Sequence, residues 1–171
     1  LCKCSIPYDT IGLSAGASAI IEVSSFMLAN PGDVAVIPAP SYPMYTNDLG
    51  VKSGIVRFDL QTHFEIKEIG SEAPVKVELL DKTLDELKVQ GKCFKLLVLS
   101  SPDNPTGCIY TEHELRKLAK WCIQHEVHMI VNEIYGLSLI DTQDDVLKQD
   151  YSMEGAYSSF AKLMNELNSD Y

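Results

Sequence analysis

The segment from Lys95 to Tyr135 constrains the fold of this chain most strongly. It contains a short apolar run, Leu96–Leu99, then a stretch rich in proline and glycine, and later a second apolar run, Met129–Val131. Short apolar runs that end in turn-forming residues are typical of strands buried on both faces of a sheet. Between the two runs, Thr111-Glu-His-Glu matches a capping box, which predicts the start of an amphipathic helix.

This order of strand, helix and strand predicts a right-handed crossover between parallel strands. The carboxyl ends of both strands then lie at the same edge of the sheet, where open α/β sheets bind their ligands. Asn104 follows the first strand, and Asn132 and Tyr135 follow the second. We therefore expect these three side chains to converge on one crevice.

A turn near the N-terminus offers a second candidate site. Thr10–Leu13 is predicted to form a short strand, and Gly16-Ala17-Ser18 lead from it into an apolar helix over Ala19–Leu28. Small residues at such a turn allow the free N–H groups of a helix N-terminus to approach an anion. The alternative is an ordinary tight turn in which Ser18 caps the helix.

The segment that follows predicts a second strand and a stiff loop. Val34–Ile37 is expected to be a buried strand, and the prolines after it hold Tyr42 at the edge of the sheet. The remaining expected elements are a short helix at Met44–Leu49, a strand at Gly54–Phe58, a loop at His63–Pro74, an amphipathic helix at Val77–Val89 and a helix that Ser158 or Ser159 caps.

The residues around Asn104 and Asn132 carry a family resemblance. Ser-Pro-Asp-Asn104-Pro-Thr-Gly107, followed by Val-Asn132-Glu-Ile-Tyr135, resembles the class I and II aminotransferases, which depend on pyridoxal 5'-phosphate (PLP). Within them the sequence is most similar to the branch of 1-aminocyclopropane-1-carboxylate (ACC) synthases and tyrosine aminotransferases. The resemblance extends from Ile11 to about Ile140.

The resemblance implies a fold-type-I α/β domain, with a mainly parallel sheet and helices on both faces. Residues 1–171 are expected to form an incomplete large, cofactor-binding domain, with the small domain and the downstream lysine region absent. The implied function is a segment of a PLP-dependent enzyme of amino-acid metabolism, either an aminotransferase or a lyase of the ACC synthase type. The alternative is a non-catalytic relative that keeps the fold as a binding or dimerisation module.

The resemblance also implies roles for individual residues. Tyr42 stacks on the pyridine ring in the family, for which a flat ring at a strand end is suited; its alternative role is packing under the loop. Asn104 and Tyr135 donate to the 3-hydroxyl oxygen of PLP, and Asn104 also reaches the substrate carboxylate. Alternatively, Asn104 is a turn residue and Tyr135 is a packing residue. The implied cofactor-binding residues are Gly16, Ala17, Ser18, Tyr42, Asn104, Asn132 and Tyr135.

Asn132 departs from the family pattern. The family places an aspartate at this position, whose charge keeps a proton on the pyridine nitrogen and makes the ring an electron sink. An amide carries no charge, so the pKa of that nitrogen should be lower here. Glu133 is not expected to replace the aspartate, because successive side chains of a strand point to opposite faces.

The lysine that binds the cofactor aldehyde in the family follows a Ser-rich turn further along the chain. Ser159-Phe-Ala-Lys162 resembles part of that pattern but lacks the glycine and arginine that should follow. We interpret Lys162 as a solvated helix residue, and no catalytic residue is assigned to the chain. Neither Arg57 nor Arg116 matches the arginine that binds the substrate carboxylate in the family.

Composition restricts the classes of partner. The chain has 24 acidic and 14 basic residues, a net charge of −10, which argues against nucleic acid and anionic membranes as partners. No apolar run approaches the length needed to span a membrane. The five cysteines are scattered, which favours a reducing, cytoplasmic location, and neither they nor the four histidines show the spacing of a metal site. The resemblance implies an amino-acid substrate and a homodimer for the complete protein.

Overall fold

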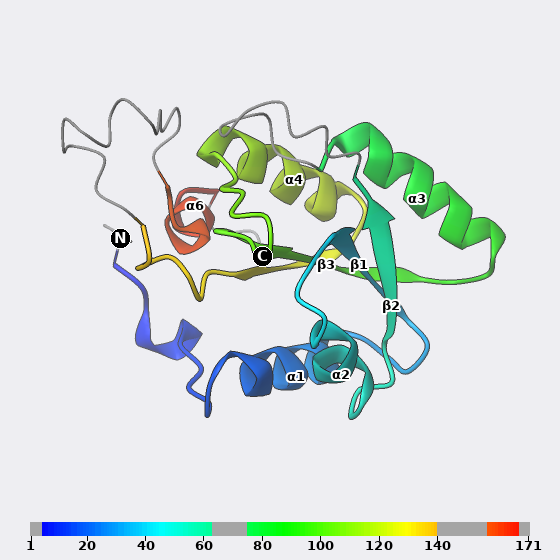
Figure 1. The fold of residues 1–171 in the computed structure, drawn as a ribbon, viewed down its shortest axis with the longest axis horizontal. Helices are drawn as coiled ribbons and strands as arrows, with labels where there is room; N and C mark the ends of the chain where they lie inside the picture. Colours follow the sequence, from blue (N-terminus) through cyan, green and yellow to red (C-terminus); the bar gives the residue numbers. More distant parts are fainter. Residues whose placement is uncertain (1–4, 63–74, 140–156, 168–171) are drawn as a thin grey trace.

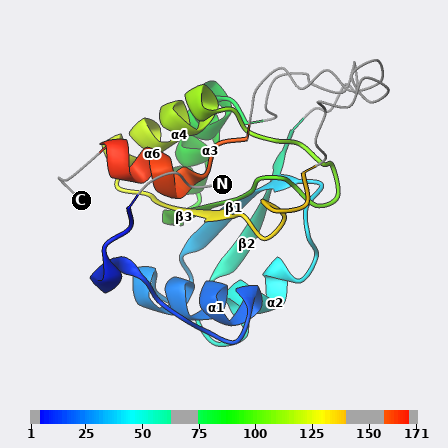
Figure 2. The same cartoon turned by 90° about the vertical axis from the view of Figure 1, so that its left-hand side faces the viewer.

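A parallel four-stranded sheet with strand order β2-β1-β3-β4 forms the centre of the molecule. The computed structural model describes residues 5–62, 75–139 and 157–167. The strands are β1 (Val34–Ala39), β2 (Val56–Gln61), β3 (Phe94–Ser100) and β4 (His128–Asn132). Helices cover both faces of the sheet (Figures 1 and 2), which confirms the predicted α/β architecture.

The two faces are covered by different sets of helices. On one face lie α1 (Ala17–Leu28) and α2 (Tyr45–Gly50), and on the other lie α3 (Val77–Val89), α4 (Glu112–Gln124) and α6 (Phe160–Leu167). Each strand contributes side chains to the hydrophobic core on both faces of the sheet, because successive residues of a strand face opposite sides. Val34 and Val36 pack under α3 and α4, whereas Ala35 and Ile37 pack against α1 and α2.

Local sequence signals start and stop the helices as predicted. The backbone N–H of Thr111 donates to the Glu114 carboxylate at 2.7 Å, and the Glu114 N–H donates to Thr111 Oγ1 at 3.3 Å, which completes the capping box of α4. α3 spans the predicted range, and Gly91 follows it with a φ of +69°, in the left-handed region that glycine adopts without strain.

The central crossover has the predicted parallel arrangement. β3 and β4 pair in parallel, and Ser100 lies beside Asn132 in the register. Both strands therefore end together at the same edge of the sheet.

The segment Thr10–Leu13 was expected to be a strand, and this expectation is wrong. The structure has a short 3-10 helix at Tyr8–Thr10, and residues 11–13 take no regular structure. These residues are not paired with the described sheet, whose edge strands are β2 and β4, and Leu13 remains 94% exposed. A β-prone sequence forms a strand only where an adjacent strand accepts its backbone hydrogen bonds. The predicted loop at 63–74 lies outside the described residues.

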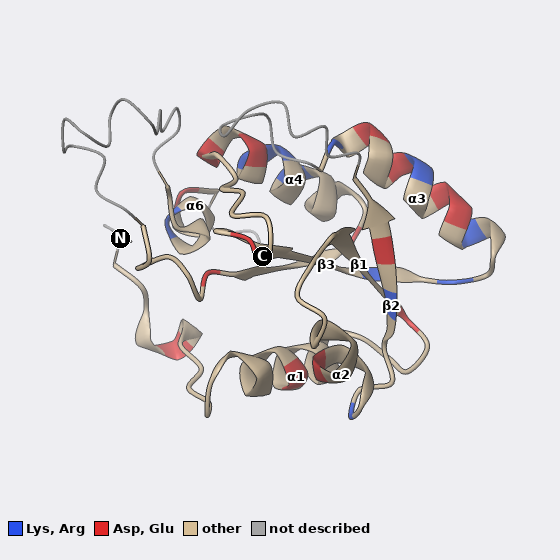
Figure 3. Cartoon of the chain, viewed as in Figure 1, with Lys and Arg blue, Asp and Glu red and all other residues tan. Residues whose placement is uncertain are grey.

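Helix α3 carries charged residues of both signs. Figure 3 shows acidic and basic residues interspersed along α3, on the other side of the sheet from α1 and α2. Within the described ranges, no helix is long and apolar enough to cross a membrane, and no His, Cys, Asp or Glu cluster could hold a metal ion.

Candidate functional site

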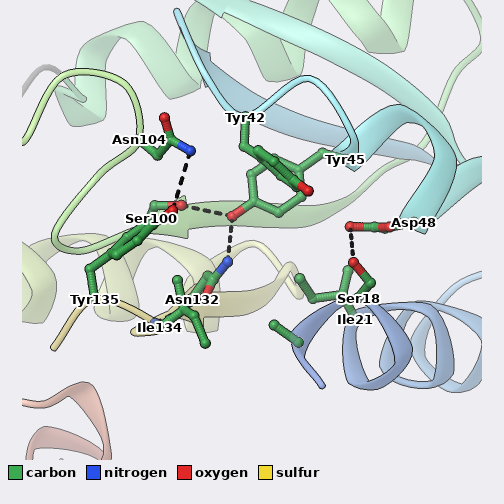
Figure 4. Close-up of a pocket in the computed structure, with 11 residues that line it drawn as sticks. Ser18, Ile21, Tyr42, Tyr45, Asp48, Ser100, Asn104, Asn132, Ile134 and Tyr135 are labelled. Atoms are coloured by element: carbon green, nitrogen blue, oxygen red, sulfur yellow. Dashed lines mark hydrogen bonds between the residues drawn. The ribbon is translucent and has the colours of Figure 1, made fainter. Parts of the chain in front are cut away.

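A pocket of about 150 Å³ lies at the carboxyl edge of the sheet, beside the N-terminus of α1 (Figure 4). It brings together most of the predicted site residues from segments that are far apart in the sequence. Gly16 directly precedes α1 but is not part of the pocket lining. The lining residues are Ala17, Ser18, Ile21, Tyr42, Tyr45, Asp48, Ser100, Asn104, Asn132, Ile134 and Tyr135.

The N-terminus of α1 forms one end of the pocket. Gly16 occupies the N-cap position with a φ of +98° and makes no side-chain cap, so the alternative of Ser18 as the cap is wrong. The first N–H groups of an α-helix have no intrahelical acceptor and carry partial positive charge. Ser18 Oγ instead donates to the Asp48 carboxylate at 3.2 Å. This end of the pocket can therefore supply backbone N–H donors to an anion.

Tyr42 lies in the loop between β1 and α2 and forms one wall. Its ring contacts the ring of Tyr45 edge to face, with centroids 5.5 Å apart and an interplanar angle of 89°. Arg57 of β2 secures the loop, because its guanidinium donates to the backbone oxygens of Tyr42 and Pro43 at 3.3 Å each. Further bonds from the guanidinium run to Asp59, Thr46 and Ser41. Arg57 is thus a structural residue of the wall.

Asn104 and Tyr135 meet across the mouth of the pocket. Asn104 Nδ2 donates to the Tyr135 hydroxyl at 3.4 Å, although 31 positions separate the two residues in the sequence. Together they present an amide and a phenol to the same space. This arrangement confirms the predicted convergence of the two residues that follow β3 and β4.

Asn132 ends β4 and is held by neighbours on two sides. Its Oδ1 accepts from the Ile134 N–H at 3.1 Å, and its Nδ2 donates to the Tyr45 hydroxyl at 2.9 Å. The Tyr45 hydroxyl also bonds Ser100 Oγ at 2.7 Å. Burial raises the pKa of Tyr45 above its usual range, so this phenol remains neutral.

The neighbouring Glu133 faces the opposite way, as predicted. Its carboxylate accepts from the Phe160 N–H at 2.6 Å and from Ser159 Oγ at 2.8 Å, which caps the start of α6. Lys162 lies on that helix, where its Nζ is 3.2 Å from the Glu112 carboxylate. No lysine or arginine of the described residues lines the pocket. Arg116 bonds Glu112 and Glu166 instead.

Five lining residues were not predicted from the sequence: Ile21, Tyr45, Asp48, Ser100 and Ile134. Ser100 could have been included, because it directly follows the apolar run of β3 and so ends that strand at the site edge. Tyr45 had no such signal. Its contact with Asn132 links residues 87 positions apart and leaves no signal in the local sequence.

The sequence comparisons show the family to which the chain belongs. The family model for class I and II aminotransferases matches residues 5–165. The chain belongs to this aminotransferase family. An ACC synthase of Oryza sativa subsp. japonica (ACC synthase 2) is 32% identical over 145 residues, which are 84% of this chain and 29% of that protein. An ACC synthase of Arabidopsis thaliana (ACC synthase 7) is 29% identical over 142 residues, 80% of this chain and 29% of the relative.

Solved aminotransferase structures share the fold. The aromatic aminotransferase of Pyrococcus horikoshii OT3 superposes with a TM-score of 0.60 at 22% identity, over 86% of this chain and 32% of that one. A PLP-bound C-S lyase of Staphylococcus hominis has a TM-score of 0.51 at 24% identity, over 68% of this chain and 27% of that one. The chain therefore has part of the fold-type-I architecture and spans less than a third of the length of these relatives.

Proposed function

We propose that the complete protein is a PLP-dependent enzyme that acts on an amino acid, and that this chain supplies part of its cofactor-binding domain. The reaction is transamination or an elimination of the ACC synthase type. The observation that carries this proposal is the convergence of Tyr42, Asn104, Asn132 and Tyr135 beside the N-terminus of α1 in one pocket.

The donors present in the pocket fit PLP. The N-terminus of α1, with Gly16, Ala17 and Ser18, offers N–H groups for the phosphate. Tyr42 supplies an aromatic wall for the ring, and the amide of Asn104 and the hydroxyl of Tyr135 offer donors for its 3-hydroxyl oxygen. Asn104 also serves the substrate carboxylate, in line with the resemblance.

PLP, when bound, withdraws electrons from the α-carbon of an amino acid. The residues of this chain contribute by holding the cofactor in a fixed position. Tyr42 would hold the cofactor ring by stacking, and Asn104 and Tyr135 would hold its 3-hydroxyl oxygen. Because Arg57 secures the loop of Tyr42, this wall is preorganised before any ligand enters.

The described residues do not supply the rest of the pocket walls or a lysine for the cofactor aldehyde. The pocket volume of about 150 Å³ is below the roughly 300–1,000 Å³ of most ligand sites, so we propose that other residues complete its walls. Because the chain matches only 29% of the length of a relative, we propose that the lysine that binds the cofactor and the small domain belong to other parts of the complete protein. This chain alone is expected to be inactive. We further propose a cytoplasmic homodimer that does not bind nucleic acid.

One observation favours a non-catalytic relative as the second candidate. Asn132 offers a neutral amide where the family has a carboxylate. A mouse relative that is 29% identical over 144 residues, 82% of this chain and 25% of its own length, is named a probable inactive ACC synthase-like protein. A protein of this kind would retain the pocket without turnover.

Titration of the full-length protein with PLP, followed by absorbance, tests the proposal. We expect saturable binding that Tyr42→Ala and Asn104→Ala each weaken by about fivefold, since a stacking contact or a hydrogen bond contributes on the order of 1 kcal/mol. Borohydride reduction and peptide mapping then locate the lysine. An adduct at Lys162 would contradict our interpretation of α6, and binding without turnover on any amino acid would support the second candidate.

A further inference from the structure

The orientation of the Asn132 amide is fixed by groups of known polarity. A backbone N–H can only donate, so the 3.1 Å contact with Ile134 assigns the oxygen of the amide to that side. The nitrogen then faces the Tyr45 hydroxyl at 2.9 Å, where the phenol oxygen accepts. Rotation of the amide by half a turn would place two N–H donors against each other, so one orientation is favoured.

Tyr45 is itself held in place. Its side chain is buried, with 1% exposure, and it reaches the site from α2 on the helical layer below the sheet. The hydroxyl bonds Ser100 Oγ at 2.7 Å, and Ser100 is the register partner of Asn132 on the neighbouring strand. The three polar groups form a continuous chain along the pocket wall (Figure 4).

We propose that Tyr45 and Ser100 orient Asn132 so that the pocket presents an N–H donor and binds PLP through an unprotonated, hydrogen-bond-accepting ring nitrogen. This inference rests on the proposed function, which places Asn132 beside that nitrogen. An amide nitrogen carries two hydrogens. The bond to Tyr45 uses one, and the described residues give Nδ2 no second acceptor. A protonated ring nitrogen is a donor and would oppose this N–H, whereas a neutral one accepts it.

The charges around the pocket agree with this assignment. Asp48 is the only carboxylate among the described lining residues, and it accepts from Ser18 at the α1 end (Figure 4). Glu133 faces α6, and Asp103, in the loop after β3, accepts from Thr106 Oγ1 at 2.6 Å. No described carboxylate therefore pairs with Asn132. Without an anion in contact, nothing in this part of the chain raises the pKa of a ring nitrogen.

The test compares two probes on the full-length protein: PLP, and its deaza analogue in which C–H replaces the ring nitrogen. Wild type should bind PLP about tenfold or more tightly than the analogue, because the analogue leaves an N–H donor unpaired. Tyr45→Phe should reduce this preference to about threefold or less. Ser100→Ala should also reduce the preference for PLP over the analogue. Tyr110→Phe is the matched control, since Tyr110 lies in the core cluster on the other face of the sheet.

The ratio of the two affinities separates orientation from general damage. If Tyr45 has only a structural role, Tyr45→Phe weakens both probes equally and the ratio stays at the wild-type value, which would overturn the proposal. NMR of PLP labelled with nitrogen-15 in the ring gives an independent readout. We expect an unprotonated nitrogen in wild type and a protonated one in Asn132→Asp. A protonated nitrogen in wild type contradicts the inference alone, whereas failure of PLP to bind at all contradicts the proposed function as well.

Discussion

The guanidinium of Arg57 donates to the backbone oxygen of Tyr42 at 3.3 Å and so connects the edge strand β2 to the aromatic wall of the pocket. The side chain of Arg57 is 16% exposed, and its other bonds reach Pro43, Ser41, Thr46 and Asp59. Arg57, a residue of an edge strand, thus holds the loop that contains Tyr42 and leads into α2.

Replacing Arg57 should therefore disturb both stability and the pocket. Arg57→Ala removes several charge-assisted hydrogen bonds from a mostly buried site, and we expect a loss of about 2 kcal/mol. In a domain of 150–250 residues this corresponds to a fall of roughly 4–8 °C in Tm, measurable by differential scanning fluorimetry. Lys52→Ala is the control, because the exposed ion pair of Lys52 with Glu22 should contribute less than about 1 kcal/mol. Equal effects of the two changes would contradict the role given to Arg57.

Glu133 provides a second test, because it caps α6 rather than serving the pocket. Glu133→Ala should destabilise the start of α6 by about 1–2 kcal/mol, since it removes an anionic N-terminal acceptor. Hydrogen exchange of the peptide that covers Phe160–Leu167 should accelerate about tenfold. PLP affinity should change little. A large loss of affinity with unchanged exchange would show that Glu133 faces the cofactor.

The strands and helices with a clear local signal were predictable from the sequence. The helix Val77–Val89, the capping box at Thr111 and the strand around Leu96–Leu99 all depend on residues that are close in the chain. The convergence of Asn104, Asn132 and Tyr135 also followed, since the handedness of the crossover fixes which strand ends meet.

Other features depend on tertiary contacts that a single sequence does not record. The pattern of Thr10–Leu13 resembles a strand, but its structure depends on whether a neighbouring strand accepts it. The contact between Tyr45 and Asn132 depends on how α2 packs under the sheet. The cap that Glu133 gives α6 is likewise a long-range contact, although the opposite directions of Asn132 and Glu133 were predictable from strand alternation.

The buried thiols give a prediction about pH. Burial raises the pKa of Cys122 to about 12 and that of Cys108 to about 11, against an ordinary value of 9.0. The unfolded chain loses these protons above pH 9.0 while the folded chain keeps them, so the free energy of unfolding should fall as pH rises through this range. Urea unfolding at several alkaline pH values should show a shallower decline for Cys122→Ala than for Cys93→Ala, because Cys93 is exposed. An identical slope in both variants would contradict this account.

The charge at position 132 should control the rate of transamination. Asn132→Asp restores an anion beside the ring nitrogen with almost no change in shape, and the Tyr45 hydroxyl can donate to the new carboxylate. We expect a gain of at least about tenfold in single-turnover rate, because a charge-assisted hydrogen bond contributes on the order of 1.5–3 kcal/mol. Asn132→Ala is the control and should not increase the rate. Normal PLP binding with an unchanged or lower rate in Asn132→Asp would show that the amide does not limit the site.

The central claim is that one pocket at the carboxyl edge of this sheet holds PLP. A crystal structure of the full-length protein with PLP tests it most directly. The account predicts the phosphate at the N-terminus of α1, the ring against Tyr42, the 3-hydroxyl oxygen within hydrogen-bond distance of Asn104 and Tyr135, and the ring nitrogen facing Asn132 Nδ2. A cofactor bound elsewhere, or one whose ring nitrogen lies away from Asn132, would contradict it.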